Sequence, residues 1–158
     1  MADTKQMRAL KATSLLKEDH KKVKKLFAEF DKLEASDDAG MVELYEKVSK
    51  ELQIHSQIEE EIFYPAVGKV EDEDAEGLVL EAQEEHKIVK TLLEELSELE
   101  VDDPDFGAKM KVLRDAVLHH AEEEEKEIFP VFHMLDKSVQ NEVSERLNLR
   151  KRELSMNE

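Results

Sequence analysis

The sequence predicts an all-α protein: an up-down-up-down antiparallel four-helix bundle with an additional C-terminal helix. Of the 158 residues 40% are charged, only four are glycine and three are proline, and Leu, Glu, Lys and Ala are abundant. This composition favours helix over sheet, and the length is that of one domain with its own core. Apolar residues recur at helical spacing in four long stretches, and the short connections make consecutive helices antiparallel neighbours.

Apolar stripes and capping residues indicate the first three helices. The first is expected over residues 13–33, and Ser36, Asp37 and Asp38 form a capping region for the second. The third should follow the acidic connection at residues 71–76, because negative charge is favourable near a helix N-terminus. The three apolar stripes are Leu16, Val23, Phe27 and Phe30; Leu44, Val48, Leu52, Ile62 and Ala66; and Val79, Ala82, Val89, Leu93 and Leu96.

Two more helices complete the predicted fold. Asp103 and Pro104 are typical of a cap and first turn, and the fourth stripe follows them with Leu113, Val117, Ile128 and Val131. Asp136 can cap a shorter fifth helix with Val139, Val143 and Leu147 on one side. The chain is therefore divided into a polar segment at residues 1–12, a bundle at residues 13–134, and a C-terminal helix and tail at residues 135–158.

An internal repeat places histidines at matching positions in the two halves of the bundle. The segment around His20 returns 66 positions later around His86, and the segment from His55 to Glu59 returns 65 positions later from His120 to Glu124. Each copy of the second segment leads into an aromatic residue and a proline, Pro65 or Pro130. All six His and Glu residues fall on the stripes that should face the interior.

These six residues predict a metal site. A single His on an apolar stripe is more often a hydrogen-bonded core residue than a ligand, and an unpaired carboxylate is costly to bury. Six such residues at repeated positions are better explained by two cations. In the simplest arrangement His20 and His55 bind one ion, His86 and His120 bind the other, and Glu59 and Glu124 bridge them.

The chemistry of these residues limits which metals fit. The chain has no cysteine, so nitrogen and oxygen ligands must hold the metal. Imidazoles with shared carboxylates suit Fe, Zn, Mn or Cu and favour iron or manganese. Of the other histidines, His119 aligns with Ile54 and His133 lies beyond the repeat, so both are expected to be structural or on the surface. No side chain is assigned as catalytic, and any activity should be that of the metal.

The pattern resembles the hemerythrin-like family, in particular its HHE cation-binding branch. The matching segments are Glu-Asp-His20-Lys, His55-x-x-x-Glu59-Glu-Glu-Ile-Phe-Tyr-Pro, Glu-Glu-His86-Lys and His120-x-x-x-Glu124-Glu-x-x-Ile-Phe-Pro. Ferritin-like di-iron bundles instead use Glu-x-x-His, and no histidine here has a Glu three residues before it. The resemblance implies two iron ions, Fe²⁺ or Fe³⁺, bridged by carboxylates and by an oxo or hydroxo group.

Two departures from respiratory hemerythrins bear on function. Those proteins carry a second His on the third helix, at the position where this chain has Ala82. The acidic ligand on their fourth helix lies five residues after the His, whereas Glu124 lies four residues after His120. We therefore expect a site that is richer in carboxylate and more symmetric than an oxygen carrier's. The resemblance implies binding, sensing or detoxification of oxygen, peroxide or nitric oxide. Catalase-like or peroxidase-like catalysis and a metal-stabilised interaction module are the alternatives.

Net charge and hydropathy argue against nucleic-acid binding, membrane association and secretion. The net charge of −17 argues against nonspecific binding to nucleic acid or an anionic membrane. No apolar run approaches the roughly 18 residues needed to span a bilayer, and the polar start of the chain lacks the features of a signal peptide. We therefore expect a cytoplasmic protein whose partner is a small molecule. The sequence leaves the protein partner unknown.

Overall fold

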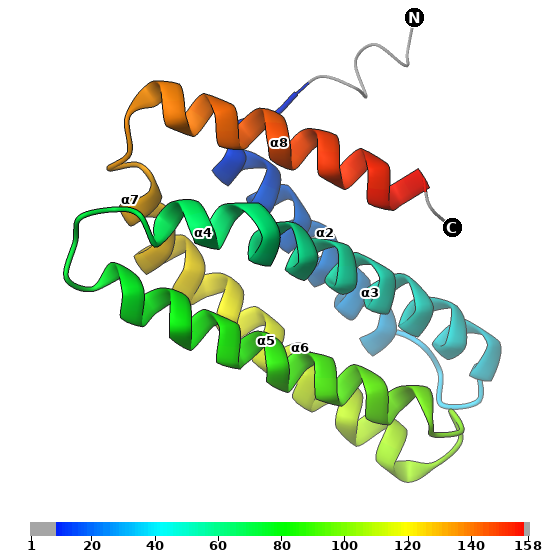
Figure 1. Cartoon of the computed structure of the whole chain (residues 1–158). Coiled ribbons are helices and arrows are strands. Elements are labelled where there is room, and N and C mark those ends of the chain that lie inside the picture. Colours follow the sequence, from blue (N-terminus) through cyan, green and yellow to red (C-terminus); the bar gives the residue numbers. More distant parts are fainter. Residues whose placement is uncertain (1–8, 157–158) are drawn as a thin grey trace, which may run out of the picture.

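The computed structural model describes residues 9–156, and every secondary-structure element within that range is helical. Four helices form the bundle: α2 (Ala12–Asp31), α3 (Asp38–Ile58), α5 (Ala75–Ser97) and α6 (Pro104–Glu123). They run antiparallel in sequence order, α2 beside α3 and α5 beside α6 (Figure 1). The predicted all-α bundle is therefore confirmed. None of the described helices is long and apolar enough to cross a membrane.

The second and fourth predicted helices each contain a π-helical turn. In the first, α3 continues through η1 (Glu59–Phe63) into α4 (Tyr64–Val67). In the second, α6 continues through η2 (Glu124–Ile128) into α7 (Phe129–Phe132). The prediction of two regular helices was wrong at these turns, which come directly after the His-x-x-x-Glu segments.

Helix starts follow the predicted capping chemistry. The Asp37 carboxylate accepts a hydrogen bond from the Gly40 N–H at 2.9 Å, and the Asp103 carboxylate accepts one from the Asp105 N–H at 2.9 Å, so orphan N–H groups at both helix starts are satisfied. A Cβ at Gly40 would lie 2.6 Å from the Asp37 carboxylate. Gly40 therefore keeps space for the cap.

The fifth helix, α8 (Lys137–Met156), is as long as α2 and packs on the outside of α2 and α3 (Figure 1). Val143 and Leu147 are buried as expected, but Val139 is exposed. The prediction of a shorter helix was thus wrong, and Val139 does not share the burial of the two residues that we expected on the same side. Asn148 ties α8 to the start of α2 by exchanging two hydrogen bonds with the Leu10 backbone.

Two apolar clusters fill the core, one toward α7 and α8 and the other toward the opposite end of the bundle. The first contains Leu16, Ile58, Phe63 and Phe132, and the second contains Val23, Leu52, Val89 and Val117. Along α2, His20 lies between Leu16 of the first cluster and Val23 of the second. The repeat places the other predicted ligands at the same height along the bundle axis. A polar layer therefore separates the two apolar clusters.

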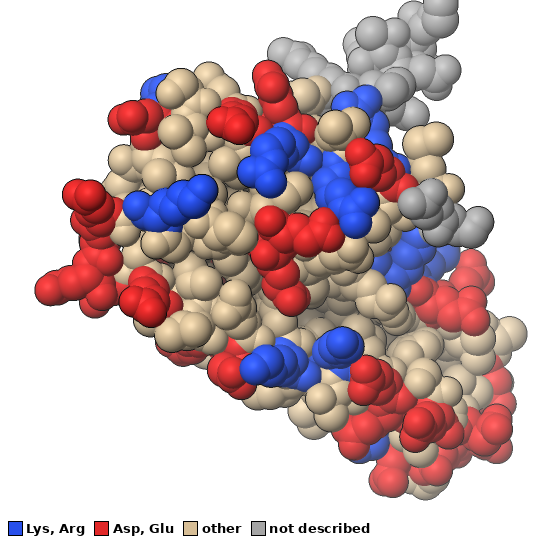
Figure 2. Space-filling model, in the orientation of Figure 1, with Lys and Arg blue, Asp and Glu red and all other residues tan. Residues whose placement is uncertain are grey.

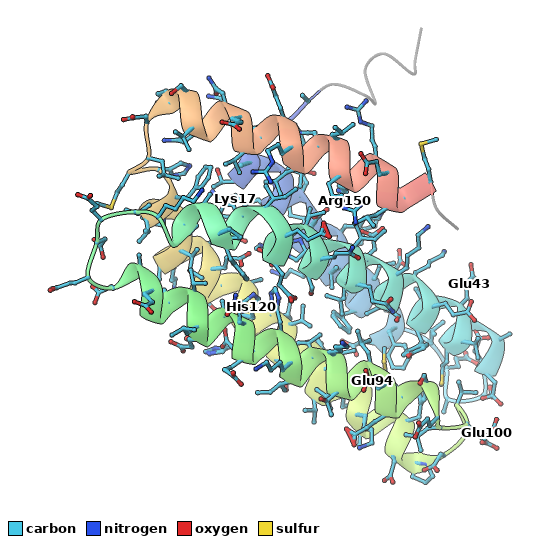
Figure 3. The ribbon with its side chains drawn as sticks, in the orientation of Figure 1. Lys17, Glu43, Glu94, Glu100, His120 and Arg150 are labelled. Carbon is cyan, nitrogen blue, oxygen red and sulfur yellow. The ribbon has the colours of Figure 1, made fainter. Side chains whose placement is uncertain are left out.

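Charge on the outside is unevenly distributed. On the face shown in Figure 2, Asp and Glu side chains gather at the two ends of the bundle, and Lys and Arg side chains lie between them together with further Asp and Glu side chains. Figure 3 places His120 among the helices, whereas Glu43 and Glu100 lie on the outside. The histidine layer is therefore shielded from bulk water, while most of the acidic side chains are solvated.

Candidate metal centre

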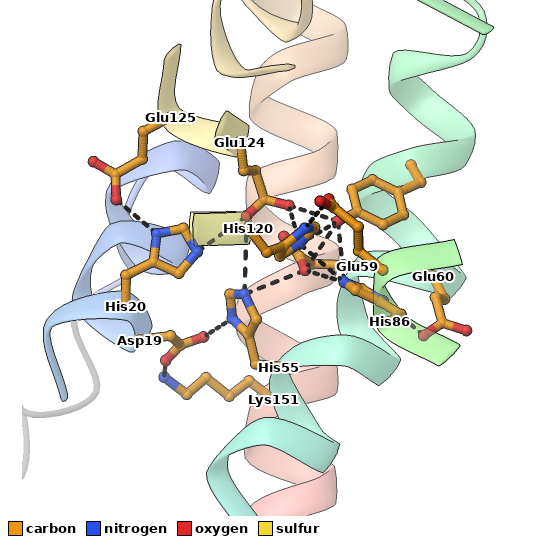
Figure 4. A network of polar contacts seen from close by, with 12 residues as sticks. Asp19, His20, His55, Glu59, Glu60, His86, His120, Glu124, Glu125 and Lys151 are labelled. Carbon is orange, nitrogen blue, oxygen red and sulfur yellow. Dashed lines mark hydrogen bonds and ion pairs between the residues drawn. The ribbon is translucent and has the colours of Figure 1, made fainter. Parts of the chain in front are cut away.

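The structure brings all six predicted residues together in the middle of the bundle (Figure 4). Glu59 and Glu124 are fully buried, His55, His86 and His120 are buried, and the His20 side chain is 9% exposed. The Nε2 atom of every ring faces a carboxylate. His20 Nε2 lies 3.1 Å from Glu124, His55 Nε2 and His86 Nε2 each lie 3.2 Å from Glu59, and His120 Nε2 lies 3.5 Å from Glu124.

Each carboxylate contacts imidazoles from both halves of the repeat. Glu59 Oε1 contacts His55 and His86. Glu124 Oε1 contacts His20 and, at 3.9 Å, His55, while Glu124 Oε2 contacts His120. Donor atoms of His20, His55, Glu59 and Glu124 lie within 4.8 Å of one another, and so do those of Glu59, His86 and His120. Two donor sets thus share the Glu59 carboxylate, so each set could hold a metal ion.

Buried atoms without a hydrogen bond supply a test of whether cations fit here. Within the described residues, the buried side-chain atoms that lack a hydrogen bond are His55 Nε2 and Glu59 Oε2. Unpaired buried polar atoms are costly and rare. Both belong to the proposed ligand set, so the residues fit a metal site.

A second layer of carboxylates, which sequence reasoning missed, orients the four imidazoles. His20 Nδ1 lies 2.7 Å from Glu125 and His86 Nδ1 lies 2.9 Å from Glu60; His55 Nδ1 lies 2.9 Å from Asp19 and His120 Nδ1 lies 2.7 Å from Glu85. In a neutral ring this pairing puts the hydrogen on Nδ1 and leaves Nε2 free to bind a metal. The signal was present in the sequence, because an acid precedes His20 and His86 and another follows Glu59 and Glu124.

The structure departs from the predicted symmetry at Tyr64, which sequence reasoning also missed. Tyr64 is fully buried, and its hydroxyl donates to Glu124 Oε2 at 2.6 Å and lies 3.2 Å from Glu59 Oε1. The same oxygen lies 3.2 Å from His86 Nε2 and 3.3 Å from His120 Nε2. The residue at this place in the second half is Phe129, which packs 6.1 Å from the parallel His20 ring and offers no oxygen. The sequence did contain a signal for this difference, because matching positions of the repeat hold a tyrosine, Tyr64, and a phenylalanine, Phe129.

The π turns determine the direction in which the Tyr64 and Phe129 side chains point. The N–H of Tyr64 donates to the Glu59 carbonyl, and that of Phe129 donates to the Glu124 carbonyl. In a regular α-helix a residue five positions on points about 140° away, but the wider turn lets Tyr64 share a face with Glu59. Pro65 and Pro130 follow immediately and lack the N–H that a regular α-helix would use there.

Lys151 adds a second difference between the halves. Its Nζ lies 2.5 Å from Asp19 Oδ1, while Asp19 Oδ2 faces His55. Burial raises the pKa of Asp19, but the hydrogen bond and charge of His55 and the charge of Lys151 outweigh it and hold the pKa below its usual range. The C-terminal helix therefore reaches the metal centre through Asp19.

The buried charges shift the ionisation of the ligands. Burial lowers the pKa of His55 and His120, but the charge of Glu59 on His55 and the hydrogen bond of Glu124 to His120 outweigh it. As a result the pKa of His55 lies well above its usual range, and that of His120 is about 9. Burial raises the pKa of Glu124, yet hydrogen bonds with Glu59, His120 and His20 hold it well below its usual range. The centre thus stabilises positive charge, whether protons or metal cations supply it.

A small cavity and a surface groove adjoin the centre. The cavity, about 30 Å³, lies against the four histidines and is closed by Val23, Leu52, Val89 and Val117. The groove, about 850 Å³, runs between α3 and α5. Leu52, Ser56, His86 and Val89 line both spaces. These side chains therefore form the wall between the outside and the cavity.

The other two histidines lie away from the centre, as expected. The His119 side chain is 65% exposed and contacts Glu123, and although Glu85 lies nearby, that carboxylate already pairs with His120. His133 Nε2 lies 3.1 Å from the Thr13 hydroxyl at the end of the bundle. Neither contributes to the buried donor sets.

Comparison with known proteins now decides the family. The family model of the hemerythrin HHE cation-binding domain matches residues 11–132. The chain belongs to the hemerythrin HHE family. A crystal structure of an HHE cation-binding domain-containing protein from Mycobacterium kansasii superposes with a TM-score of 0.79 and covers 92% of this chain and 87% of that one. At 24% sequence identity, that likeness confirms the fold alone.

One curated relative contains the HHE segment within a longer chain. A protein from Nostoc sp. (strain PCC 7120) described as a DNA nickase is 30% identical over 115 residues, which make up 73% of this chain and 31% of that protein. This HHE chain thus spans less than a third of the relative's length. Family membership and the His and Glu cluster support metal binding by this chain.

Proposed function

We propose that this HHE protein binds two iron ions and reacts with oxygen, peroxide or nitric oxide. The main support is that four imidazole Nε2 atoms from the two halves of the repeat face the same two buried carboxylates, Glu59 and Glu124. Iron is favoured because mixed imidazole and carboxylate ligands suit a redox-active ion. Bound iron would supply electron transfer and open coordination positions for small ligands.

The protein residues have separate tasks in this proposal. His20 and His55 would hold one ion and His86 and His120 the other, with Glu59 and Glu124 shared between them. The carboxylates on Nδ1 keep each ring in the metal-binding tautomer. The apolar clusters on either side exclude water and strengthen the attraction between the carboxylates and the cations.

The adjoining spaces favour a small ligand. A cavity of about 30 Å³ has room for roughly one water-sized molecule, and its apolar closure suits a diatomic molecule. The groove between α3 and α5 brings solvent to the other side of its wall. The nickase activity of the longer relative is not favoured here, because a net charge of −17 repels a polyanion.

Optical spectroscopy under controlled gas tests this function. The protein is loaded anaerobically with ferrous iron, exposed to air and then purged with argon while the near-ultraviolet and visible spectrum is recorded. We expect a charge-transfer band that free iron under the same conditions does not give. A band that vanishes under argon would indicate reversible binding, and one that persists would indicate oxidation of the pair. No band beyond that of free iron would overturn the proposal.

A further inference from the structure

We infer that Lys151, on the C-terminal helix, makes the iron held by His20 and His55 the first ion of the pair to be reduced. The inference rests on the proposed iron pair and adds a way in which α8 controls its chemistry. Lys151 is a positioning residue, because it reaches the ion only through Asp19 and His55. Three observations support it: the contacts of Asp19, the burial of Asp19 and the contrast with the other half of the repeat.

Asp19 joins Lys151 to a metal-binding ring through its two oxygens (Figure 4). Oδ2 lies 2.9 Å from His55 Nδ1, and Oδ1 lies 2.5 Å from Lys151 Nζ. The Asp19 side chain is 3% exposed, whereas that of Lys151 is 32% exposed. Water screens the interaction of buried charges less than that of exposed ones. A change of charge at the surface of α8 is therefore felt at His55.

The charge of Lys151 acts on the ion at His55 in one direction. A carboxylate at Nδ1 raises the basicity of the imidazole, which stabilises the more highly charged state of the metal. Lys151 draws electron density toward the other oxygen of Asp19, so less of it reaches the ring. Its own positive charge also opposes a third positive charge on the ion. Both effects favour ferrous over ferric iron at His20 and His55.

The surface above Asp19 strengthens this effect. An open pocket of about 370 Å³ lies there, between α2 and α8, and its lining comprises Glu18, Asp19, Lys21, Lys22, Lys25 and Lys151. In a chain with a net charge of −17, this pocket has the opposite sign to the molecule as a whole. The charge around Asp19 is therefore a local feature of the α2 and α8 pair.

The matching acid of the other half, Glu85, has different neighbours. Glu85 precedes His86 as Asp19 precedes His20, and its Oε1 lies 2.7 Å from His120 Nδ1. Beside it lie His119 and Glu123. A second carboxylate near Glu85 strengthens its negative field, whereas Lys151 offsets that of Asp19. The ion at His86 and His120 should therefore be harder to reduce.

The step concerned is the transfer of one electron. A mediated electrode supplies the electron, the ion at His20 and His55 passes from ferric to ferrous, and no covalent bond of the protein forms or breaks. A second electron then reduces the ion at His86 and His120. The two ions therefore differ in reduction potential, and Lys151 contributes to the difference.

Stepwise reduction of the iron-loaded protein, followed by its visible spectrum at controlled potential, tests the inference. We expect two one-electron steps in wild type. Lys151→Met should lower the equilibrium constant of the first step about tenfold, or about 59 mV for one electron, and change the second step much less. Lys151→Arg keeps the charge and should retain the wild-type value. The control Lys126→Met breaks an exposed pair with Glu122 and should shift neither step.

Two further variants separate charge from packing. Lys151→Gln keeps a hydrogen-bond donor beside Asp19 without the charge, so it should shift the first step as Lys151→Met does, and it serves if Lys151→Met fails to fold. Asp19→Asn removes the negative charge at His55 and leaves Lys151 positive, so it should shift the first step in the opposite direction. Looser packing of α8 would instead shift all three variants in the same direction.

The count of bound iron keeps the two proposals apart. With two irons per chain, a single two-electron step in wild type would overturn the role of Lys151 and leave the iron pair standing. The same conclusion would follow from a first step unchanged in both Lys151→Met and Lys151→Gln, or from shifts of one sign in these variants and Asp19→Asn. Failure of wild type to bind iron would overturn both proposals.

Discussion

Burial of four imidazoles and two carboxylates in one layer would be strongly destabilising without compensating charge, because each unpaired buried charge costs several kcal/mol. Both halves of the repeat offset this penalty in the same way, by pairing imidazoles with carboxylates. Each ring is held by a carboxylate at Nδ1 and faces a second carboxylate at Nε2. At this scale the chain is built to concentrate negative charge around a small volume.

Substitution of either shared carboxylate should release metal. We expect Glu59→Ala and Glu124→Ala to lower bound iron sharply, below one ion per chain, because each side chain contacts imidazoles of both halves. Elemental analysis after dialysis measures this. His119→Ala, whose side chain is exposed, is the control and should retain the wild-type iron content. Unchanged iron in Glu59→Ala would contradict the bridging role.

The carboxylates that hold the rings should affect affinity rather than stoichiometry. We expect Asp19→Asn and Glu85→Gln each to weaken iron binding by about 10- to 100-fold, as is typical of partners that orient metal-binding histidines. Competition with a chelator gives the affinities. Glu84→Gln, next to Glu85 but paired with Lys87 on the surface, is the matched control. Equal affinity in Glu85→Gln and Glu84→Gln would argue against an orienting role.

The sequence was informative about residues that repeat and silent about those that do not. His20, His55, His86, His120 and their two glutamates could be found because they combine repetition with positions on apolar stripes. Tyr64 could not be assigned, because its position faces the centre only through a π turn. The four histidines and the carboxylates on their Nδ1 atoms repeat between the halves, and the halves differ at Tyr64 and at Lys151.

At the scale of elements, the helix ends and the antiparallel arrangement of the four bundle helices were predictable, and the packing of α8 was not. The caps at Asp37 and Asp103 follow from side chains that accept N–H groups within the next three residues. The π turns depend on burial of Glu59 and Glu124 and on the prolines that follow. The place of α8 depends on distant contacts, among them the bond from Lys151 to Asp19, which no spacing along the chain reveals.

The docking of α8 can be tested at that bond. We expect Lys151→Met to lower the free energy of unfolding by about 1–3 kcal/mol, because buried Asp19 loses a charged partner while the apolar stem of the side chain is kept. Chemical denaturation of the metal-free protein measures it. The control Lys126→Met breaks an exposed pair with Glu122 and should change stability by less than about 0.5 kcal/mol. Equal effects would mean that Lys151 contributes no more than a surface charge.

At the scale of the whole molecule, the centre couples folding to protons and metal. The pKa of His120 is raised to about 9 by Glu124, Glu59 and Glu85 against the opposing effect of burial, and those of His55 and His86 are also raised. A raised pKa in the folded state stabilises the fold fully below the unfolded value of 6.5, and this contribution is lost as the pH rises through the folded value.

The metal-free protein should therefore become less stable between pH 6.5 and about 9. His120 alone corresponds to about 3 kcal/mol, since one pKa unit is worth about 1.4 kcal/mol. Denaturant unfolding at a series of pH values measures the trend. Stability that rises over this interval would contradict the ionisation described here. Iron-loaded protein should not show the loss, because bound metal keeps the imidazoles neutral.

The central claim, a bridged pair of ions shared between the two halves of the repeat, is tested most directly by Mössbauer spectroscopy of protein loaded with ⁵⁷Fe and oxidised, with iron counted per chain. We predict two irons per chain whose spins couple through the shared ligands to give no net magnetism at low temperature. Two uncoupled high-spin ferric ions, or a single iron per chain, would contradict the bridged centre.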